Sequence, residues 1–167
     1  MTIKRAGIVY GLITGLLILL YGLFTIYIKQ DVNQSTISIV TSVILMGGMA
    51  YALLEFRKYN QGYITVKEAF GINFYVSLFA GMGLGLYSYY LLTYIDQSLL
   101  LQLQRDQLKV LEENGYAEKE LMMIKQQIGY IVTPIFFFFV NIIATLFQGI
   151  LIGTMMSLIL RKLPESN

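Results

Sequence analysis

Three amide side chains, and one hydroxyl between two of them, are candidate polar sites inside the otherwise apolar stretches of this chain. They are Asn73, Asn141, Thr145 and Gln148. The last three share one helical face, because residues three and four apart lie one above the other. In hydrocarbon such groups need polar partners, and buried polar residues often mark the path of a substrate. The pattern therefore predicts either hydrogen bonds between neighbouring membrane helices or a path for a neutral solute.

The residue types that usually carry acid–base or nucleophilic catalysis are missing. The chain contains no His and no Cys, which removes the usual general base and the thiolate nucleophile. The apolar stretches offer only hydroxyls and amides, whereas catalysis requires a titratable or activated group in a pocket. We therefore expect no enzymatic activity, no catalytic residue, no metal and no cofactor. The net charge of +2 is too small to indicate nucleic acid binding.

Four segments without any charged residue must position these polar groups. They cover residues 6–28, 37–54, 69–95 and 128–160. An uncharged apolar run of 18 or more residues is long enough to cross about 30 Å of hydrocarbon as a helix. The first run is too long for a signal peptide and lacks a cleavage site, so we expect it to be retained. The sequence thus predicts an all-α, polytopic protein, with residues 1–167 forming a single domain in the lipid bilayer.

Basic residues favour one side of these predicted spans. The N-terminal tail, the second connection and the C-terminal tail together hold seven of the 12 basic residues: Lys4, Arg5, Arg57, Lys58, Lys67, Arg161 and Lys162. Because basic residues are enriched on the cytoplasmic side of membrane proteins, we expect both termini to be cytoplasmic.

The connection between the third and fourth spans, residues 96–127, has the pattern of a helical hairpin. No Gly or Pro interrupts residues 98–114, where strong helix formers predominate. Asn114 and Gly115 are typical of a helix end followed by a reversal. We expect an extracytoplasmic hairpin whose arms extend the adjoining spans. Its apolar stripe either packs against the return arm or forms a surface for a second protein or lipid headgroups.

Small residues recur every four positions along several predicted spans. The glycines of these ladders are Gly7, Gly11, Gly15, Gly81, Gly85, Gly149 and Gly153. This spacing lets two helix backbones approach closely in a membrane. Packing within the bundle is the simpler interpretation, and formation of a homo-oligomer is the alternative.

The approach to the third span resembles a known family. Gly62-Tyr63-Ile64-Thr65-Val66-Lys67-Glu68-Ala69-Phe70 is similar to the G-x-I-S/T-x-x-x-A-F motif of the bacterial domain-of-unknown-function family 4199. The charged insertion before the last span and the basic C-terminal end match as well. The resemblance implies a four-span integral protein of a bacterial inner membrane, without assigned activity or site residues. Independently, Thr65 and Glu68 have capping-box spacing at a helix start.

Two functions follow from these observations. The first is a non-enzymatic accessory or scaffolding component that acts through helix association, as a homo-oligomer or with a membrane protein partner at the 96–127 hairpin. The alternative is a small transporter or channel subunit that conducts a neutral solute as an oligomer. Asn141, Thr145 and Gln148 would then line the path.

Overall fold

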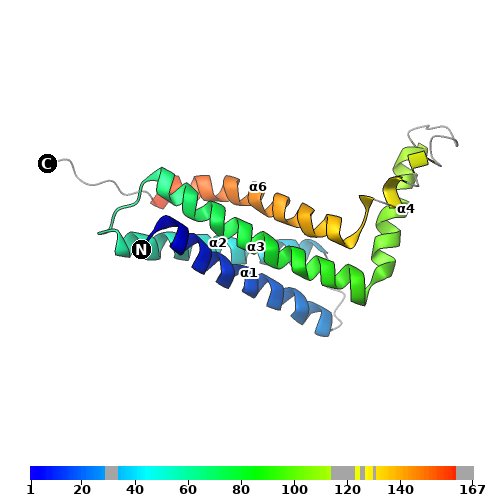
Figure 1. The fold of residues 1–167 in the computed structure, drawn as a ribbon, viewed down its shortest axis with the longest axis horizontal. Coiled ribbons are helices and arrows are strands. Elements are labelled where there is room, and N and C mark those ends of the chain that lie inside the picture. The colour runs from blue at the N-terminus through cyan, green and yellow to red at the C-terminus, as the bar shows by residue number, and fades with distance from the viewer. Residues whose placement is uncertain (29–33, 114–122, 125–126, 130, 161–167) are drawn as a thin grey trace. The chain divides into compact units, whose positions relative to one another are not determined.

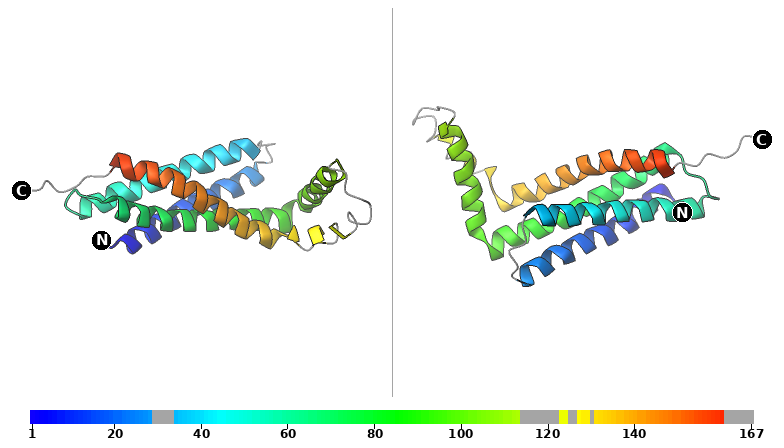
Figure 2. Two further views of the ribbon diagram at one scale, coloured as in Figure 1. Left: turned by 90° about the horizontal axis from the view of Figure 1, so that it is seen from above. Right: turned by 180° about the vertical axis from the view of Figure 1, so that it is seen from behind.

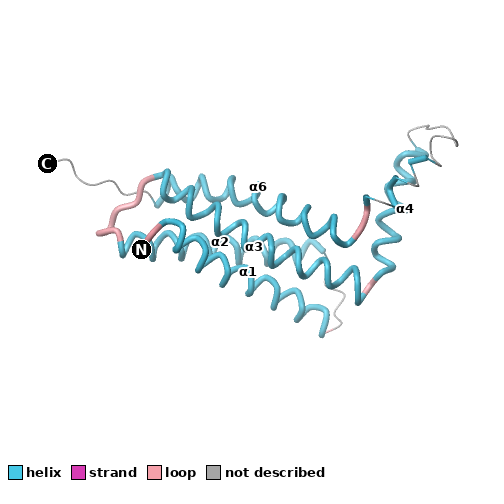
Figure 3. Tube along the Cα trace, in the orientation of Figure 1, coloured by secondary structure: helices cyan, strands magenta, loops and turns pink. Residues whose placement is uncertain are grey.

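The chain folds into helices that match the predicted all-α class. The computed structural model describes residues 1–28, 34–113, 123–124, 127–129 and 131–160. The elements, coloured along the chain in Figure 1 and by type in Figure 3, are α1 (Ile3–Tyr27), α2 (Gln34–Tyr59), α3 (Val66–Tyr90), the π-helix η1 (Leu91–Ile95), α4 (Gln97–Glu113) and α6 (Pro134–Leu160).

Four of these helices are long and apolar enough to cross a membrane. Within the described residues the candidate spans are Ile3–Tyr27, Ser35–Tyr59, Val66–Ile95 and Pro134–Ile159. Their outward side chains are largely apolar, as Leu16 at 56% exposure and Leu151 at 70% exposure illustrate. Because such surfaces match hydrocarbon rather than water, the protein is a multi-pass membrane protein, with four candidate spanning helices among its described residues.

The spans differ from the apolar blocks at their ends. Helix α2 continues past residue 54 and ends at Tyr59, so Glu55, Arg57 and Lys58 are helical. The fourth span begins at Pro134 rather than near residue 128. Proline suits the first position of a helix because its missing N–H would have no partner there. Thr133 precedes it, and its Oγ1 accepts a hydrogen bond from the Phe136 N–H at 3.3 Å.

The chain divides into two compact units, residues 1–84 with 141–167 and residues 85–140. The first unit contains α1, α2, most of α3 and most of α6, which Figures 1 and 2 show side by side. The starts of α1 and α3 and the ends of α2 and α6 lie at the same end of this unit. Its core includes Ile18, Leu45, Met49 and Val76, each at most 2% exposed.

A tight connection joins α2 to α3 at that end. Gln61 and Gly62 have φ values of 54° and 86°, and the Gly62 N–H donates to the Arg57 carbonyl at 2.9 Å. This is the hydrogen bond of a Schellman helix end. The expected capping box follows, because the Thr65 N–H donates to Glu68 Oε2 at 2.9 Å and the Glu68 N–H to Thr65 Oγ1 at 3.3 Å.

The second unit contains the first arm of the expected hairpin, which is α4. One face of this helix is half-buried and consists of Leu100, Gln104, Leu108 and Leu111. The Gln104 side chain donates to the Val132 carbonyl at 3.2 Å. Leu101, on another side of α4, is 51% exposed. The Asn114-Gly115 reversal and the start of the return arm lie outside the described residues.

Candidate functional site

Asn73 is the most deeply buried of the predicted polar residues. It comes from the first half of α3, is 2% exposed, and donates from Nδ2 to the Gly153 carbonyl of α6 at 3.1 Å. Among the described residues no hydrogen-bond partner reaches its Oδ1. Half of this amide therefore ties two helices together, and the other half is a buried acceptor in an apolar interior.

The surroundings of Asn73 are closely packed. A Cβ on Gly153 would lie 2.9 Å from the Asn73 Cβ, and one on Gly149 would overlap the Ser77 hydroxyl. Ser77 donates to the Asn73 carbonyl at 2.7 Å. We call Asn73, Ser77, Gly149 and Gly153 the polar seam. Because glycine has no side chain, α3 and α6 approach each other closely along this seam.

The predicted shared face of α6 is divided between two neighbours. Thr145 is 5% exposed and lies beside Gly81 of α3, where an added Cβ would sit 3.2 Å from the Thr145 Cβ. Gln148 instead donates from Nε2 to the Ser42 hydroxyl of α2 at 2.6 Å. Asn141 is half-buried and is not without an interaction partner. Thr145 and Gln148 therefore contact different helices and do not converge on one site.

The remaining glycines of the ladders also contact neighbouring helices within their own unit. A Cβ on Gly11 would lie 2.9 Å from the Tyr75 carbonyl oxygen, and one on Gly83 would overlap the Gly15 backbone. Gly7 likewise faces Tyr75. Gly85, in the second unit, would place a Cβ 2.8 Å from the Phe138 carbonyl oxygen. The structure thus uses the ladders for close packing inside the chain.

One candidate residue was not predicted from the sequence, the carboxylate Glu55. Its side chain is 20% exposed and its Oε2 lies 3.1 Å from the Lys58 Nζ. One turn earlier, the ring of Tyr51 packs edge-on against Tyr10 of α1, with centroids 5.3 Å apart. The predicted second span ends at residue 54, directly before this carboxylate. The sequence feature that could have identified Glu55 is its spacing from Lys58, because oppositely charged residues three apart on a helix can form an ion pair.

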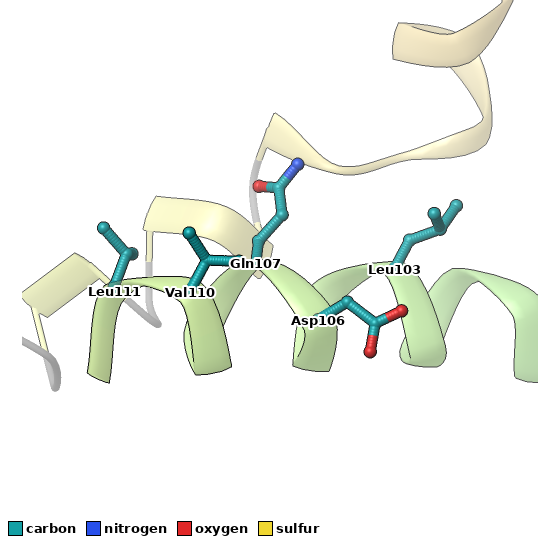
Figure 4. A pocket seen from close by; sticks show the side chains of 5 residues that line it. All are labelled: Leu103, Asp106, Gln107, Val110 and Leu111. Carbon is teal, nitrogen blue, oxygen red and sulfur yellow. The ribbon is translucent and has the colours of Figure 1, made fainter. Parts of the chain in front are cut away.

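Helix α4 carries a hollow on its surface, with a volume of about 410 Å³. Among the described residues, those that line it belong to α4: Leu103, Asp106, Gln107, Val110 and Leu111. Figure 4 shows the side chains of Leu103, Gln107, Val110 and Leu111 raised on one side of the helix, with Asp106 lying below them. Leu103 and Val110 are 36% and 56% exposed. An apolar depression with polar edges can receive an apolar side chain.

The start of α4 is fixed by Asp96, which precedes its first residue. Its Oδ1 accepts hydrogen bonds from the Ser98 hydroxyl, from the Ser98 N–H at 3.0 Å and from the Leu99 N–H at 3.3 Å. These hydrogen bonds lower the pKa of Asp96 below its ordinary value of 3.8, and the bond from the Ser98 hydroxyl has the largest effect. Asp96 therefore acts as a charged cap for the amides that have no partner within the helix.

Neither unit gathers the groups of an acid–base or metal centre within the part of the chain that is described. There, no cluster of three or more His, Cys, Asp or Glu side chains could hold a metal ion. The polar seam offers hydrogen bonds in a tight interface, and α4 offers an apolar hollow. The hydrogen bonds of the seam hold α3 and α6 together, and α4 exposes apolar side chains around its hollow.

Comparison with known protein families matches most of the chain. The family described as "Protein of unknown function (DUF4199)" matches residues 6–162. No curated protein and no solved structure matches the chain.

Proposed function

Since the chain belongs to the DUF4199 family of proteins of unknown function, we propose that it is a non-enzymatic accessory or scaffolding component that acts through helix association. The bundle supplies the anchor in the membrane, and α4 supplies the contact with a partner. The partner is a membrane protein or a second copy of this chain.

The exposed apolar surface of α4 carries this proposal. Leu103 and Val110 are exposed around the hollow, on a helix that also bears Arg105, Asp106 and Lys109. Such a helix is too polar to span a bilayer, so insertion across the membrane does not account for its exposed apolar groups. Apolar patches rimmed by polar residues outside the membrane mark interaction sites.

The close packing of the bundle supports the same division of roles. The ladder glycines of α1, α3 and α6 contact neighbouring helices of the same chain. They already serve internal packing, which leaves α4 as the better candidate for contacts with other proteins. The predicted orientation places both termini in the cytoplasm of a bacterial cell and α4 on the outer side of its inner membrane.

Photocrosslinking from α4 in native membranes tests this function. A photoreactive phenylalanine in place of Leu103 should form an adduct with a protein, because a partner side chain occupies the hollow. The adduct should disappear when Val110→Asp places a charge in the same hollow. A probe at Leu16, which is 56% exposed on α1, is the control for contact with lipid. Identical adduct patterns from Leu103 and Leu16 would remove α4 as the association surface.

The alternative, conduction of a neutral solute, is supported by the buried Oδ1 of Asn73, which has no partner among the described residues. Gln148→Leu removes the polar group nearest the middle of α6, and solute flux into liposomes measures its effect. A several-fold loss of flux would favour a transport role over association. Flux equal to that of the unchanged protein would exclude Gln148 from such a path.

A further inference from the structure

A lateral groove between α1 and α2 lies within the spanning part of the first unit. It has a volume of about 180 Å³ and is lined by Tyr10, Ile13, Thr14, Leu17, Ile44, Gly47, Gly48 and Tyr51. A groove of this volume has room for more than one group of the size of a water molecule. Since methylene groups have nearly that size, the groove suits a short stretch of an alkyl chain.

The floor of this groove is tight and its polar atoms are satisfied. The Thr14 hydroxyl donates to the Tyr10 carbonyl at 2.7 Å, so it seeks no other partner. Gly48 lies against Thr14 so closely that an added Cβ would overlap the threonine side chain. The floor therefore behaves as an apolar surface formed by the closest approach of the two helices.

One wall of the groove is missing a side chain. Gly47 lines it, yet a Cβ at this position would meet no atom within 4 Å. Packing between helices thus gives no reason for glycine here, unlike at Gly48 one residue further. A glycine in a helix interior costs about 1 kcal/mol relative to alanine. The open notch at Gly47 is what gives the groove its volume.

The polar end of the groove continues along the same face of α2. Ile44, Gly47, Tyr51, Glu55 and Lys58 follow one another at spacings of three and four residues, which places them on one helical stripe. The Lys58 side chain is 72% exposed and lies 3.1 Å from Glu55. An ammonium group has three N–H donors, so Lys58 can hold Glu55 and still donate to an anion. Tyr51 lies between Gly47 and Lys58 on this stripe, and tyrosine rings are enriched at headgroup level in membrane proteins.

We propose that this groove is a binding site for one phospholipid, with an acyl chain along Gly47 and the phosphate at Lys58. Hydrocarbon surrounds the groove, since Ile13 and Tyr51 at its edges are 49% and 56% exposed on spanning helices. The apolar groove and the cationic end match the two parts of such a lipid. The site is independent of the association surface on α4.

Native mass spectrometry of the purified full-length chain tests this proposal. The probes are a phosphatidylglycerol and a diacylglycerol with identical acyl chains, titrated into the detergent-solubilised protein. The first molecule of phosphatidylglycerol should bind at least tenfold more tightly than the first molecule of diacylglycerol, a difference of about 1.4 kcal/mol in binding free energy. Equal affinities would overturn the role of the phosphate.

Two variants then separate the groove from general lipid adhesion. Gly47→Leu should fill the notch without disturbing the fold and should weaken binding of the phospholipid about tenfold, or about 1.4 kcal/mol. Val43→Phe adds bulk at a position that is 58% exposed and outside the groove, so it should bind as the unchanged protein does. If Gly47→Leu and Val43→Phe bind the phospholipid with equal affinity, the groove does not hold its acyl chain.

Changes at Lys58 test the polar end. Lys58→Gln should remove most of the preference for the phospholipid, and Lys58→Arg should restore it because the positive charge returns. A retained preference in Lys58→Gln would place the phosphate elsewhere. The same spectra report oligomeric state. If Gly47→Leu abolishes a dimer mass and leaves lipid adducts unchanged, a second copy of the chain fills the groove and the lipid proposal fails.

Discussion

The side-chain amide of Asn73 donates to the Gly153 carbonyl at 3.1 Å, at a point where α3 and α6 touch through a glycine. This hydrogen bond connects residues 80 positions apart and lies in a closely packed part of the bundle. Nothing larger than glycine fits at position 153 without displacing the asparagine. The polar contact and the small residue thus depend on each other, and both determine how closely the helices approach.

The first prediction concerns this bond. Asn73→Asp replaces the donor by a carboxylate that faces the Gly153 carbonyl in a buried interface. An uncompensated buried charge costs about 3–5 kcal/mol, so thermal unfolding in detergent at neutral pH should occur at a much lower temperature. The control Asn73→Leu removes donor and acceptor together and should cost far less, since such interhelical bonds contribute about 0.6 kcal/mol on average. An aspartate variant as stable as the unchanged protein would show that position 73 is open to water.

The second prediction compares one substitution at two glycines. Gly83→Ala should destabilise the bundle by roughly 1–3 kcal/mol, because its Cβ would overlap the backbone of Gly15. Gly47→Ala should be neutral or stabilising by up to about 1 kcal/mol, since its Cβ meets nothing and alanine favours the helix. Unfolding curves of both variants under the same conditions give the two changes in the free energy of unfolding. Equal shifts would contradict the packing of α1 against α3.

The third prediction concerns the contact between α2 and α6. Gln148 Nε2 donates to Ser42 Oγ at 2.6 Å. In a double-mutant cycle with Gln148→Leu and Ser42→Ala, the coupling energy should be about 0.6 kcal/mol and at most about 1.7 kcal/mol. Additive effects of the two substitutions on stability would mean that the side chains do not meet.

The fourth prediction concerns pH and the start of α4. The pKa of Asp96 is lowered in the folded protein by bonds from Ser98 and Leu99. The cap is therefore fully formed above the ordinary pKa of 3.8 and is lost as pH falls through the lower folded value. After correction for intrinsic rates, hydrogen exchange at the Ser98 and Leu99 amides should accelerate in that acidic range. Asp96→Asn keeps an acceptor but cannot ionise, and its exchange should show no such transition.

Much of the fold was predictable because its causes are local. Uncharged blocks long enough to cross a bilayer predicted the four spans, and Thr65 and Glu68 predicted the cap of α3 that the structure confirms. The family resemblance was confirmed over residues 6–162. These features depend on residues close together in sequence, where spacing alone specifies the structure.

The candidate sites were harder to predict because they depend on contacts between helices. Helical spacing grouped Thr145 with Gln148, yet the first lies against α3 and the second reaches α2. Spacing places side chains on a face but does not say where two neighbours meet. Glu55 was missed because a charge-based boundary ends a span where the first carboxylate occurs, although helix α2 continues to Tyr59.

The topology of the chain is the claim on which its function depends, and the natural absence of cysteine allows a direct test. Single cysteines replace Lys4, at the start of α1, and Gln102, on the exposed surface of α4. In intact cells a membrane-impermeant maleimide should label Gln102→Cys at once and Lys4→Cys only after permeabilisation. Labelling of Lys4→Cys in intact cells, with Gln102→Cys protected, would contradict the account.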